Sequence, residues 1–572
     1  MGGFNKLQHT DIDEFEIITK NAVGVQKETL GRILKENAES EYLLNHGLAG
    51  RTDTESFKSC IPLATHKDFE SYIQRIADGD SPSSILTTKP ITQISLSSGT
   101  TQGKPKFIPF NDRILNDTME IYKTSNAYRH REYPLTRGKG LQLVYAGKQA
   151  RTKGGVILST ATTHVFSSEE YRKIIHKTHC SPEEVVFGYD FQQSTYCHLL
   201  CALLNSDEVE FVFSKFGHSI VQAFRTFEQI WEQLCSDIRE GVLSKLITAP
   251  AMRTAVSKLL RRPDPDLATS IESKCRNLTD WYGVIPTLFP NSKYVYGILT
   301  GAMEPYLNKL RHYAGDLPLV SAYYGASEGW IGACIDPTDP PETATYTILP
   351  HIGYFEFIPI LKDNQGATSR PVLGIEDLVV GKEYEILITN SAGLYRYNIG
   401  DVVRVSGFHN AAPKLKFVCR RNVLLSINID KNSEKDIQIA VDEVGKVLKS
   451  SKCEVVDFTS YADRSSQPGH YVVFLEINGK ASERVLEECA TCMDLSFLDA
   501  GYLSSRKTNG IGALEIRVVR NGTFGKILDH YTSAGAAVSQ FKTPRCIGAA
   551  NEKVLDILTA GVEDRYFSNA FK

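Results

Sequence analysis

One stretch of the chain combines hydroxyl groups, glycines and lysines at a spacing suited to phosphate. Ser95–Lys106 reads Ser-Leu-Ser-Ser-Gly-Thr-Thr-Gln-Gly-Lys-Pro-Lys. Backbone N–H groups in such a loop can surround phosphate oxygens, Gly99 and Gly103 permit positive φ, and the lysines supply positive charge. A Walker P-loop is excluded, because three residues instead of four separate the glycines. The stretch predicts a different phosphate-binding loop, or otherwise a polar surface loop.

A second stretch, Tyr323–Trp330, reads Tyr-Tyr-Gly-Ala-Ser-Glu-Gly-Trp. An aromatic ring beside a glycine can stack on a nucleotide base, and Glu328 can hold a divalent cation against phosphates. The same residues match the G-x-S-x-G pattern of a serine hydrolase, with Ser327 as its nucleophile. That pattern requires a helix directly after the serine, whereas the following residues predict a strand and a loop. The hydrolase is therefore the remote alternative.

A third stretch, Gly393–Asp401, lies between two predicted strands. Asp401 follows a glycine and can accept the hydroxyl groups of a ribose, although a hairpin turn explains the same residues. In chain order the three stretches offer a phosphate loop, an aromatic shelf with a metal carboxylate, and a ribose acid. Together they predict one nucleotide pocket.

The elements that position these stretches form two units. The chain has 572 residues, which exceeds one hydrophobic core. We expect a large α/β domain over residues 1–425 and a smaller α+β domain over residues 426–572. Apolar periodicity predicts helices at 12–34, 112–128, 194–204, 220–240, 434–448, 482–497 and 524–531, and strands at 141–145, 156–159, 182–187, 209–216, 454–458, 471–477 and 514–519.

Composition narrows the class of protein. The net charge of -3 leaves no overall basic field for nucleic acid, and no apolar run approaches the roughly 18 residues of a membrane span. The 12 cysteines are scattered, as in proteins with reduced thiols, and the first residues do not read as a signal peptide. We expect a cytoplasmic monomer that binds small molecules, and neither nucleic acid nor membrane.

The order of the three stretches resembles that of acyl-adenylate-forming enzymes, and more narrowly the plant acyl acid-amido synthetases of the Gretchen Hagen family. The carrying residues are Ser97–Lys106, Tyr324–Glu328 and Tyr397–Asp401. The resemblance runs nearly end to end, through 281–286, 313–320, 426–431 and 540–545. Within the family it is strongest to the enzymes that join jasmonic acid to isoleucine.

The resemblance implies an α/β fold with a large N-terminal acyl-adenylate-forming domain, in which helices flank mixed sheets and one small part is β-barrel-like. A smaller, mobile α+β C-terminal domain follows. It implies an ATP- and Mg²⁺-dependent ligase that adenylates jasmonic acid, transfers the acyl group to isoleucine, and releases AMP and pyrophosphate in plant defence signalling. An amido synthetase for auxin or a benzoate is the alternative.

The resemblance also implies roles for individual residues. Ser98, Lys431 and Lys542 would be catalytic, Glu328 would bind Mg²⁺, and Ser98, Thr162 and Lys542 would surround the amino acid. ATP or AMP would contact Ser97, Ser98, Thr100, Thr101, Thr300, Gly301, Tyr324, Gly325, Ala326, Ser327, Asp401, Arg420 and Lys431. The acyl acid would lie against Ile114, Thr118, Tyr122, Phe213, Lys215 and Trp330, of which the first three share one helix face by their spacing.

Two residues depart from the family pattern. Asn398 stands where the third motif has arginine, which leaves a protein that binds without catalysis as another alternative. Lys215 stands where jasmonate-selective relatives have an uncharged residue. A buried lysine needs a partner or a lowered pKa, so Lys215 is predicted either to meet an acidic group of the substrate or to point into solvent.

Overall fold

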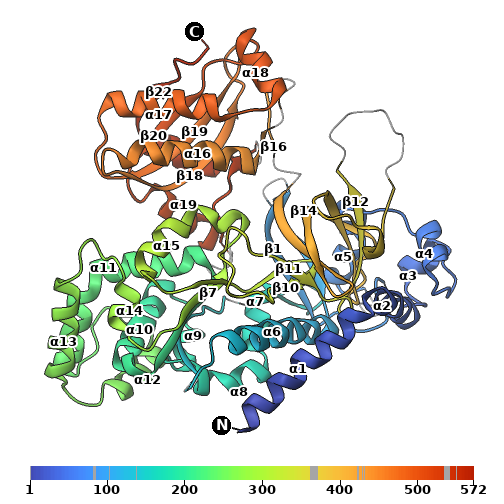
Figure 1. Cartoon of the computed structure of the whole chain (residues 1–572), viewed down its shortest axis with the longest axis horizontal. Helices are drawn as coiled ribbons and strands as arrows, with labels where there is room; N and C mark the ends of the chain where they lie inside the picture. Colours follow the sequence, from blue (N-terminus) through green and yellow to red (C-terminus); the bar gives the residue numbers. More distant parts are fainter. Residues whose placement is uncertain are drawn as a thin grey trace.

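The computed structural model describes the chain except residues 1, 81–84, 102–103, 137, 148, 361–370, 421–423, 428–429, 431, 534–540, 549–550 and 572. For residues 2–9, 97–101, 104–105, 170, 302, 305, 424 and 500 it describes the backbone alone. In Figure 1 the orange and red C-terminal part lies above a larger body that holds the blue, green and yellow segments.

A parallel sheet lies at the centre of the larger body, in the order β3(Lys139–Leu143), β6(Val209–Phe216), β7(Tyr294–Ile298) and β8(Leu319–Ser321). Every residue of β6 is buried, as expected when helices cover both faces of a parallel sheet. The helices around it include α10(Phe191–Leu204) and α11(Gly217–Glu240), which pack on β3 and β6. The predicted strand 209–216 is confirmed to the residue.

A second sheet contains the predicted phosphate loop. Its order is β2(Lys104–Phe110), β1(Gln93–Thr101), β5(Ile157–Ser159) and β4(Ala150–Arg151). The prediction of a loop over Ser95–Lys106 is wrong for most of its length, because β1 and β2 pair as an antiparallel hairpin. Pairing is irregular between Leu96 and Thr100, so the backbone of 97–99 leaves the regular ladder. The apolar and threonine residues on either side of the tip favour strands.

The third sheet has seven antiparallel strands. It corresponds to the predicted β-barrel-like part, although in the described residues it stays open, with β12 and β9 as its end strands. Its order is β12(Tyr354–Pro359), β13(Glu383–Thr389), β14(Tyr397–His409), β15(Ala412–Arg420), β11(Tyr346–Ile348), β10(Gly329–Ala333) and β9(Tyr323–Ala326).

Helix α6(Asp112–Glu132) joins these sheets, since it follows β2 directly and packs against β9 and β10. Asn111 caps it by accepting a hydrogen bond from the N–H of Ile114 at 3.2 Å. The predicted helix pair at the N-terminus is α1(Gly2–Lys20) and α2(Ala22–Glu36). The remaining helices of the larger body are α3(Glu41–Asn45), α4(Thr54–Cys60), α5(His66–Asp78), α7(Ala161–Ser167), α8(Glu169–Thr178), α9(Glu183–Val186), α12(Pro250–Leu260), α13(Pro265–Arg276), α14(Val284–Leu288) and α15(Leu307–Ala314), with short 3₁₀ turns η1(Ser206–Glu208), η2(Gly301–Tyr306) and η3(Ile375–Asp377).

One predicted strand is wrong. Residues 182–187 form the short helix α9 instead. Pro182 precedes it, and Glu183 and Glu184 occupy its first turn, where negative charge favours a helix. These residues favour the start of a helix more strongly than the following apolar residues favour a strand.

The C-terminal part is an α+β unit with its own apolar core. Its sheet has the order β21(Cys546–Ile547), β18(Glu454–Asp463), β19(His470–Asn478), β20(Glu515–Val519) and β22(Val562–Phe567). Two hydrophobic clusters here contain residues from Leu425 onward alone. The helices are α16(Glu434–Lys449), α17(Glu483–Ser496), α18(Ala500–Lys507), α19(Thr523–Ser533) and α20(Glu552–Gly561), and a small ribbon of β16(Leu424–Leu425) and β17(Asn432–Ser433) precedes α16. Within the described residues, none of the helices has the length and apolar character that crossing a membrane requires.

A buried ion pair ties α4 to the third sheet. The Arg396 guanidinium donates two hydrogen bonds to the Glu356 carboxylate, at 3.0 and 3.1 Å, and both side chains are at most 7% exposed. Its third nitrogen donates to the carbonyl oxygens of Lys58 and Ile61. This bidentate pair has good geometry, and removal of one partner leaves a buried charge without compensation.

We expect Arg396→Met to lower the free energy of unfolding of the larger body by about 3–5 kcal/mol. The matched control is Arg404→Met, which removes a solvent-exposed pair with Glu383 and should cost about 1 kcal/mol or less. Urea unfolding followed by tryptophan fluorescence measures both, since Trp231, Trp281 and Trp330 all precede the C-terminal part. Equal losses in the two variants would contradict this account of the buried pair.

Candidate functional site

Three strands of the seven-stranded sheet meet at Asp401, whose side chain is buried. Tyr324 on β9 donates its hydroxyl hydrogen to Oδ2 at 2.8 Å, and Arg420 at the end of β15 donates from Nε to Oδ1 at 2.9 Å. The Asp401 carboxylate is the largest cause that raises the pKa of Arg420, and burial beside the same carboxylate raises that of Tyr324. Both partners therefore hold their protons and act as hydrogen-bond donors to the Asp401 side chain.

Glu328 lies in the two-residue turn between β9 and β10, next to Ser327. Tyr397 on β14 donates its hydroxyl hydrogen to Glu328 Oε1 at 3.2 Å, and Asn390 Nδ2 donates to the Glu328 carbonyl oxygen at 2.7 Å. The serine hydrolase alternative is wrong in its geometry. Strand β10 follows Ser327, whereas a nucleophile elbow turns from a strand into a helix.

An aromatic shelf adjoins Asp401. The ring of Tyr324 lies 5.7 Å from that of Tyr346 and 5.9 Å from that of Phe417. Thr300 shares a hydrogen bond of 2.9 Å with the Tyr346 hydroxyl. Gly301 has φ +62°, and a Cβ there would lie 2.8 Å from the Phe417 ring, so the close approach requires glycine. The structure thus brings the predicted residues Thr300, Gly301 and Tyr324 together.

The pairing of β9 with β10 explains why a glycine follows Tyr324. A Cβ on Gly325 would lie 2.4 Å from the indole ring of Trp330 across the β9–β10 pair. Gly325 and Ala326 therefore form a narrow part of the strand against which Trp330 packs. The shelf residues Tyr346 and Phe417 escaped the sequence analysis, because each reads as an ordinary aromatic residue of a strand.

The predicted phosphate residues Ser97, Ser98, Thr100 and Thr101 lie on β1, and their side chains are outside the described residues. Their position is defined through β5, which pairs in parallel with β1 so that Ser95 lies opposite Ser159. Thr162 in α7 follows Ser159 by three positions, as Ser98 follows Ser95. Thr162 is buried, and it lies at the start of α7, just after the strand that pairs with β1.

The predicted acyl residues converge on one aromatic cluster. Thr118 Oγ1 accepts a hydrogen bond of 2.6 Å from the Trp330 indole and donates one to the Ile114 carbonyl oxygen. The Tyr122 ring lies 5.6 Å from Trp330 and 4.9 Å from Tyr323. Phe213 and Tyr122 pack in one hydrophobic cluster, in which Phe213 stacks on Tyr296.

Lys215 lies in the same cluster, two residues after Phe213 on β6, and its side chain is buried. Its Nζ lies 4.5 Å from the centre of the Trp330 ring and 4.6 Å from that of Tyr323. Burial, with a smaller contribution from the Lys542 charge, lowers the pKa of Lys215 to about 7. The predicted orientation into solvent is therefore wrong. Cation–π contacts stabilise an ammonium group here, and the ion pairs found among the described residues include none with Lys215.

Lys542 belongs to the C-terminal part but faces the larger body. Its Nζ lies 4.8 Å from the Phe216 ring centre, and burial followed by the charge of Arg420 lowers its pKa to about 8. Neighbouring residues fix this segment, since Thr543 donates to Asp457 at 2.6 Å and Arg545 donates to the Tyr306 hydroxyl at 3.1 Å. Lys431, the other predicted lysine, lies outside the described residues.

Asn398 forms hydrogen bonds within β14 and to the neighbouring strand β13. Its Oδ1 accepts a hydrogen bond of 2.8 Å from the N–H of Gly400, and its Nδ2 donates to Glu385 at 3.0 Å. Gly400 has φ +77°. Asn398 thus stabilises the backbone that presents Asp401, through an acceptor oxygen that an arginine side chain does not have.

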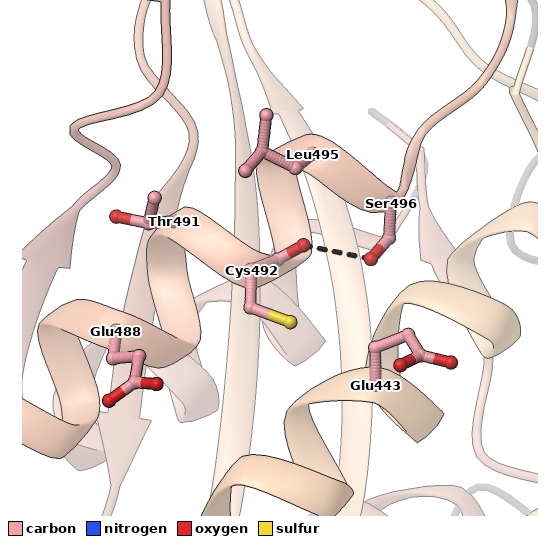
Figure 2. A pocket seen from close by; sticks show the side chains of 6 residues that line it. All are labelled: Glu443, Glu488, Thr491, Cys492, Leu495 and Ser496. Carbon is pink, nitrogen blue, oxygen red and sulfur yellow. Dashed lines mark hydrogen bonds between the residues drawn. The ribbon is translucent and has the colours of Figure 1, made fainter.

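A hollow of about 460 Å³ lies elsewhere, between α16 and α17. Figure 2 shows its lining, where Ser496 donates a hydrogen bond of 2.8 Å to the carbonyl oxygen of Cys492. None of the predicted site residues lines it. Among the described residues, no group of three or more His, Cys, Asp or Glu side chains could hold a metal ion, so Glu328 would act as a single carboxylate.

Comparison with known proteins identifies the family and the fold of the chain. Models of the GH3 family match the chain as its N-terminal domain over residues 11–319, its central domain over 346–420 and its C-terminal domain over 435–551. The jasmonoyl–L-amino acid synthetase JAR4 of Nicotiana attenuata is 60% identical over 563 residues, covering 98% of this chain and 97% of the relative. The indole-3-acetic acid-amido synthetase GH3.10 of Arabidopsis thaliana is 48% identical over 590 residues, covering 98% of this chain and 99% of the relative.

A solved structure of the GH3.15 acyl acid amido synthetase has 36% sequence identity to the chain and a TM-score of 0.90, covering 98% of this chain and 97% of the other. This likeness confirms the predicted α/β fold with its N-terminal and C-terminal parts. The chain belongs to the GH3, or Gretchen Hagen, family of acyl acid amido synthetases.

Proposed function

We propose that this chain activates jasmonic acid with ATP and transfers the acyl group to isoleucine, releasing pyrophosphate and AMP. The enzyme class, an acid–amino acid ligase, follows from the family, and the proposal concerns the acid, the amino acid and the residues. The observation that carries it is the junction of Asp401, Tyr324 and Arg420 beside an aromatic cluster that contains the predicted acyl residues. The 60% identity to a jasmonoyl–amino acid synthetase, against 48% to an auxin synthetase, favours jasmonate.

In this proposal Asp401 accepts the ribose hydroxyls, and the shelf of Tyr324, Thr300 and Gly301 holds adenine. Gly325, Ala326 and Ser327 continue that wall towards the phosphates. Arg420 would balance the charge of Asp401 and also face the α-phosphate. Negative charge grows there as the carboxylate of the acyl acid attacks. Ser97 and Ser98, in the irregular part of β1, and Thr100 and Thr101, directly after it, would donate to phosphate oxygens.

Mg²⁺ fits the residues present. Proteins often hold Mg²⁺ through one or two carboxylates plus substrate phosphates, and Glu328 is a buried carboxylate fixed by Tyr397. When bound, the ion would neutralise phosphate charge. The chain's own contribution is to keep Glu328 oriented and to exclude water from the turn.

The second half-reaction would use the C-terminal part. We propose two domains, 1–425 and 426–572, that change their relative position between the half-reactions, with Lys431 and Lys542 as the charged residues that enter in turn. Lys542 is supported by its present position against Phe216. Ser98 and Thr162 would orient the amine of the amino acid, because both follow the paired residues of β1 and β5.

An amido synthetase for auxin or a benzoate is the alternative function, since an aromatic cluster also suits a planar acid. Release of pyrophosphate with a panel of acids and mass spectrometry of the amide decide between them. Jasmonate with isoleucine should give the highest kcat/KM. Preference for indole-3-acetate would overturn the proposed acid, and the absence of ATP-dependent pyrophosphate release with any acid would overturn the proposal as a whole. Action in the cytoplasm, as a monomer and in defence signalling, completes the proposal. The scattered cysteines support the cytoplasm, and the family resemblance supports defence signalling.

Asp401→Asn should raise the KM for ATP by about 10-fold or more, because a hydrogen bond to a charged group contributes about 1.5–3 kcal/mol. Steady-state pyrophosphate release at varied ATP measures it. Glu383→Gln is the matched control, since it removes the carboxylate of an exposed arginine pair on the neighbouring strand. The assignment of Asp401 to the ribose fails if both variants keep the KM of the original protein.

Lys542 should give the amide-forming step an alkaline limit. A lysine carries its charge below its pKa, so activity that needs the ammonium group falls as pH rises through about 8. Lys542→Arg keeps the charge to much higher pH and should remove that fall, whereas Lys542→Met should lose most activity at every pH. Rates of amide formation between pH 6 and 10 measure this. An unchanged alkaline limit in the arginine variant would assign the limit to another group.

A further inference from the structure

Lys215 is enclosed on three sides by aromatic rings. Its Nζ lies 4.5 Å from the Trp330 ring centre, 4.6 Å from that of Tyr323 and 5.8 Å from that of Tyr122. Only 8% of the residue is exposed. We call Lys215 with these three rings the lysine box. It lies in the cluster of predicted acyl residues, at the end of β6.

The ammonium group of the lysine box lacks acceptors. A protonated lysine has three N–H donors, but within the described part of the chain its one hydrogen-bond partner is the Tyr323 hydroxyl, at 3.5 Å. The ion pairs of the described residues include none with Lys215, and the nearby cation Lys542 repels it. Buried donors are normally satisfied, so this group is built to receive an acceptor from a ligand.

The alternation of side chains along β6 and β9 indicates which substrate the lysine box faces. On β9, Tyr323 points to the lysine box while the next residue, Tyr324, donates to Asp401. On β6, Lys215 points to the box while Phe216 contacts Lys542. Successive side chains of a strand face opposite sides. The box therefore lies on the acyl side of these strands, away from the side where the reacting carboxyl group meets the nucleotide.

We propose that Lys215 is a specificity-determining residue that donates hydrogen bonds to an oxygen on the acyl acid remote from the reacting carboxyl group. The substrate class is an acyl acid with such an acceptor, and in jasmonic acid the acceptor is the ring ketone. This inference rests on the proposed function, because it takes the aromatic cluster as the acyl pocket. An ammonium group discriminates strongly between a ligand with the oxygen and one without it, since its donors stay unpaired in the second case.

The test compares jasmonic acid with its analogue in which the ring ketone is replaced by a methylene group. Wild-type protein should turn over jasmonic acid with a kcat/KM at least about 10-fold higher, mainly through KM, as expected for binding remote from the reacting centre. Lys215→Met should bring the ratio close to one by losing activity on the ketone acid. Lys215→Arg, which retains donors, should keep part of the preference.

Lys245→Met is the matched control, because Lys245 is an exposed lysine of the same body, and it should leave the ratio unchanged. Lys215→Leu replaces the methionine variant if that protein does not fold, as judged by its thermal unfolding. An analogue with a carboxylate in place of the ketone separates the two kinds of acceptor. Faster turnover of it by the wild-type protein, lost in Lys215→Met, supports an anionic acceptor at the same group.

The inference is overturned if wild-type protein treats the ketone and methylene acids alike, or if Lys215→Met keeps the wild-type ratio. Failure of the proposed function looks different, because then wild-type protein releases no pyrophosphate with either acid. In that case the dissociation constants of the two acids, measured by isothermal titration calorimetry, give the same ratio test. A ratio that is present in wild-type protein and absent in Lys215→Met still supports Lys215.

Discussion

The buried carboxylate of Asp401 is the interaction on which the arrangement of the site depends. A charge removed from water needs hydrogen bonds and an opposite charge close by, and Asp401 takes them from Tyr324 and Arg420, on two other strands. This requirement fixes the ends of β9, β14 and β15 relative to one another. The turn with Glu328 and the shelf with Gly301 lie beside this junction, so satisfying one carboxylate also positions the aromatic, acidic and glycine residues around it.

The contact between the two parts of the chain is also electrostatic. Asp457 of β18 binds Thr543 and Arg545, and Arg545 in turn donates to the Tyr306 hydroxyl of the larger body. Because Lys542 directly precedes Thr543, the hydrogen bond of Thr543 to Asp457 also limits where Lys542 can lie. The lowered pKa values of Lys542 and Lys215 have a common physical origin, since both ammonium groups lose water where other cations are near.

Much of this structure could be predicted from the sequence. Hydrophobic periodicity gave α11, β6 and the helix–strand order of the C-terminal part, because each has a clear buried face. The structure of Ser95–Lys106 was harder to predict. Its glycines indicate a loop, but the residues on either side pair with each other as the strands of a hairpin. Tyr346 and Phe417 could not be found at all, as their role comes from long-range pairing of β11 with β15. The burial of Lys215 likewise depends on rings from α6, β9 and β10.

The two-sided use of β6 and β9 has a consequence for how such enzymes diverge. Lys215 and Tyr323 contact each other on one side, whereas Phe216 contacts Lys542 and Tyr324 contacts Asp401 on the other. In the proposed assignment, a substitution at position 215 or 323 can therefore change the accepted acid without disturbing adenylation. Such single substitutions reshape the acyl side while the hydrogen bond between Tyr324 and Asp401 stays in place.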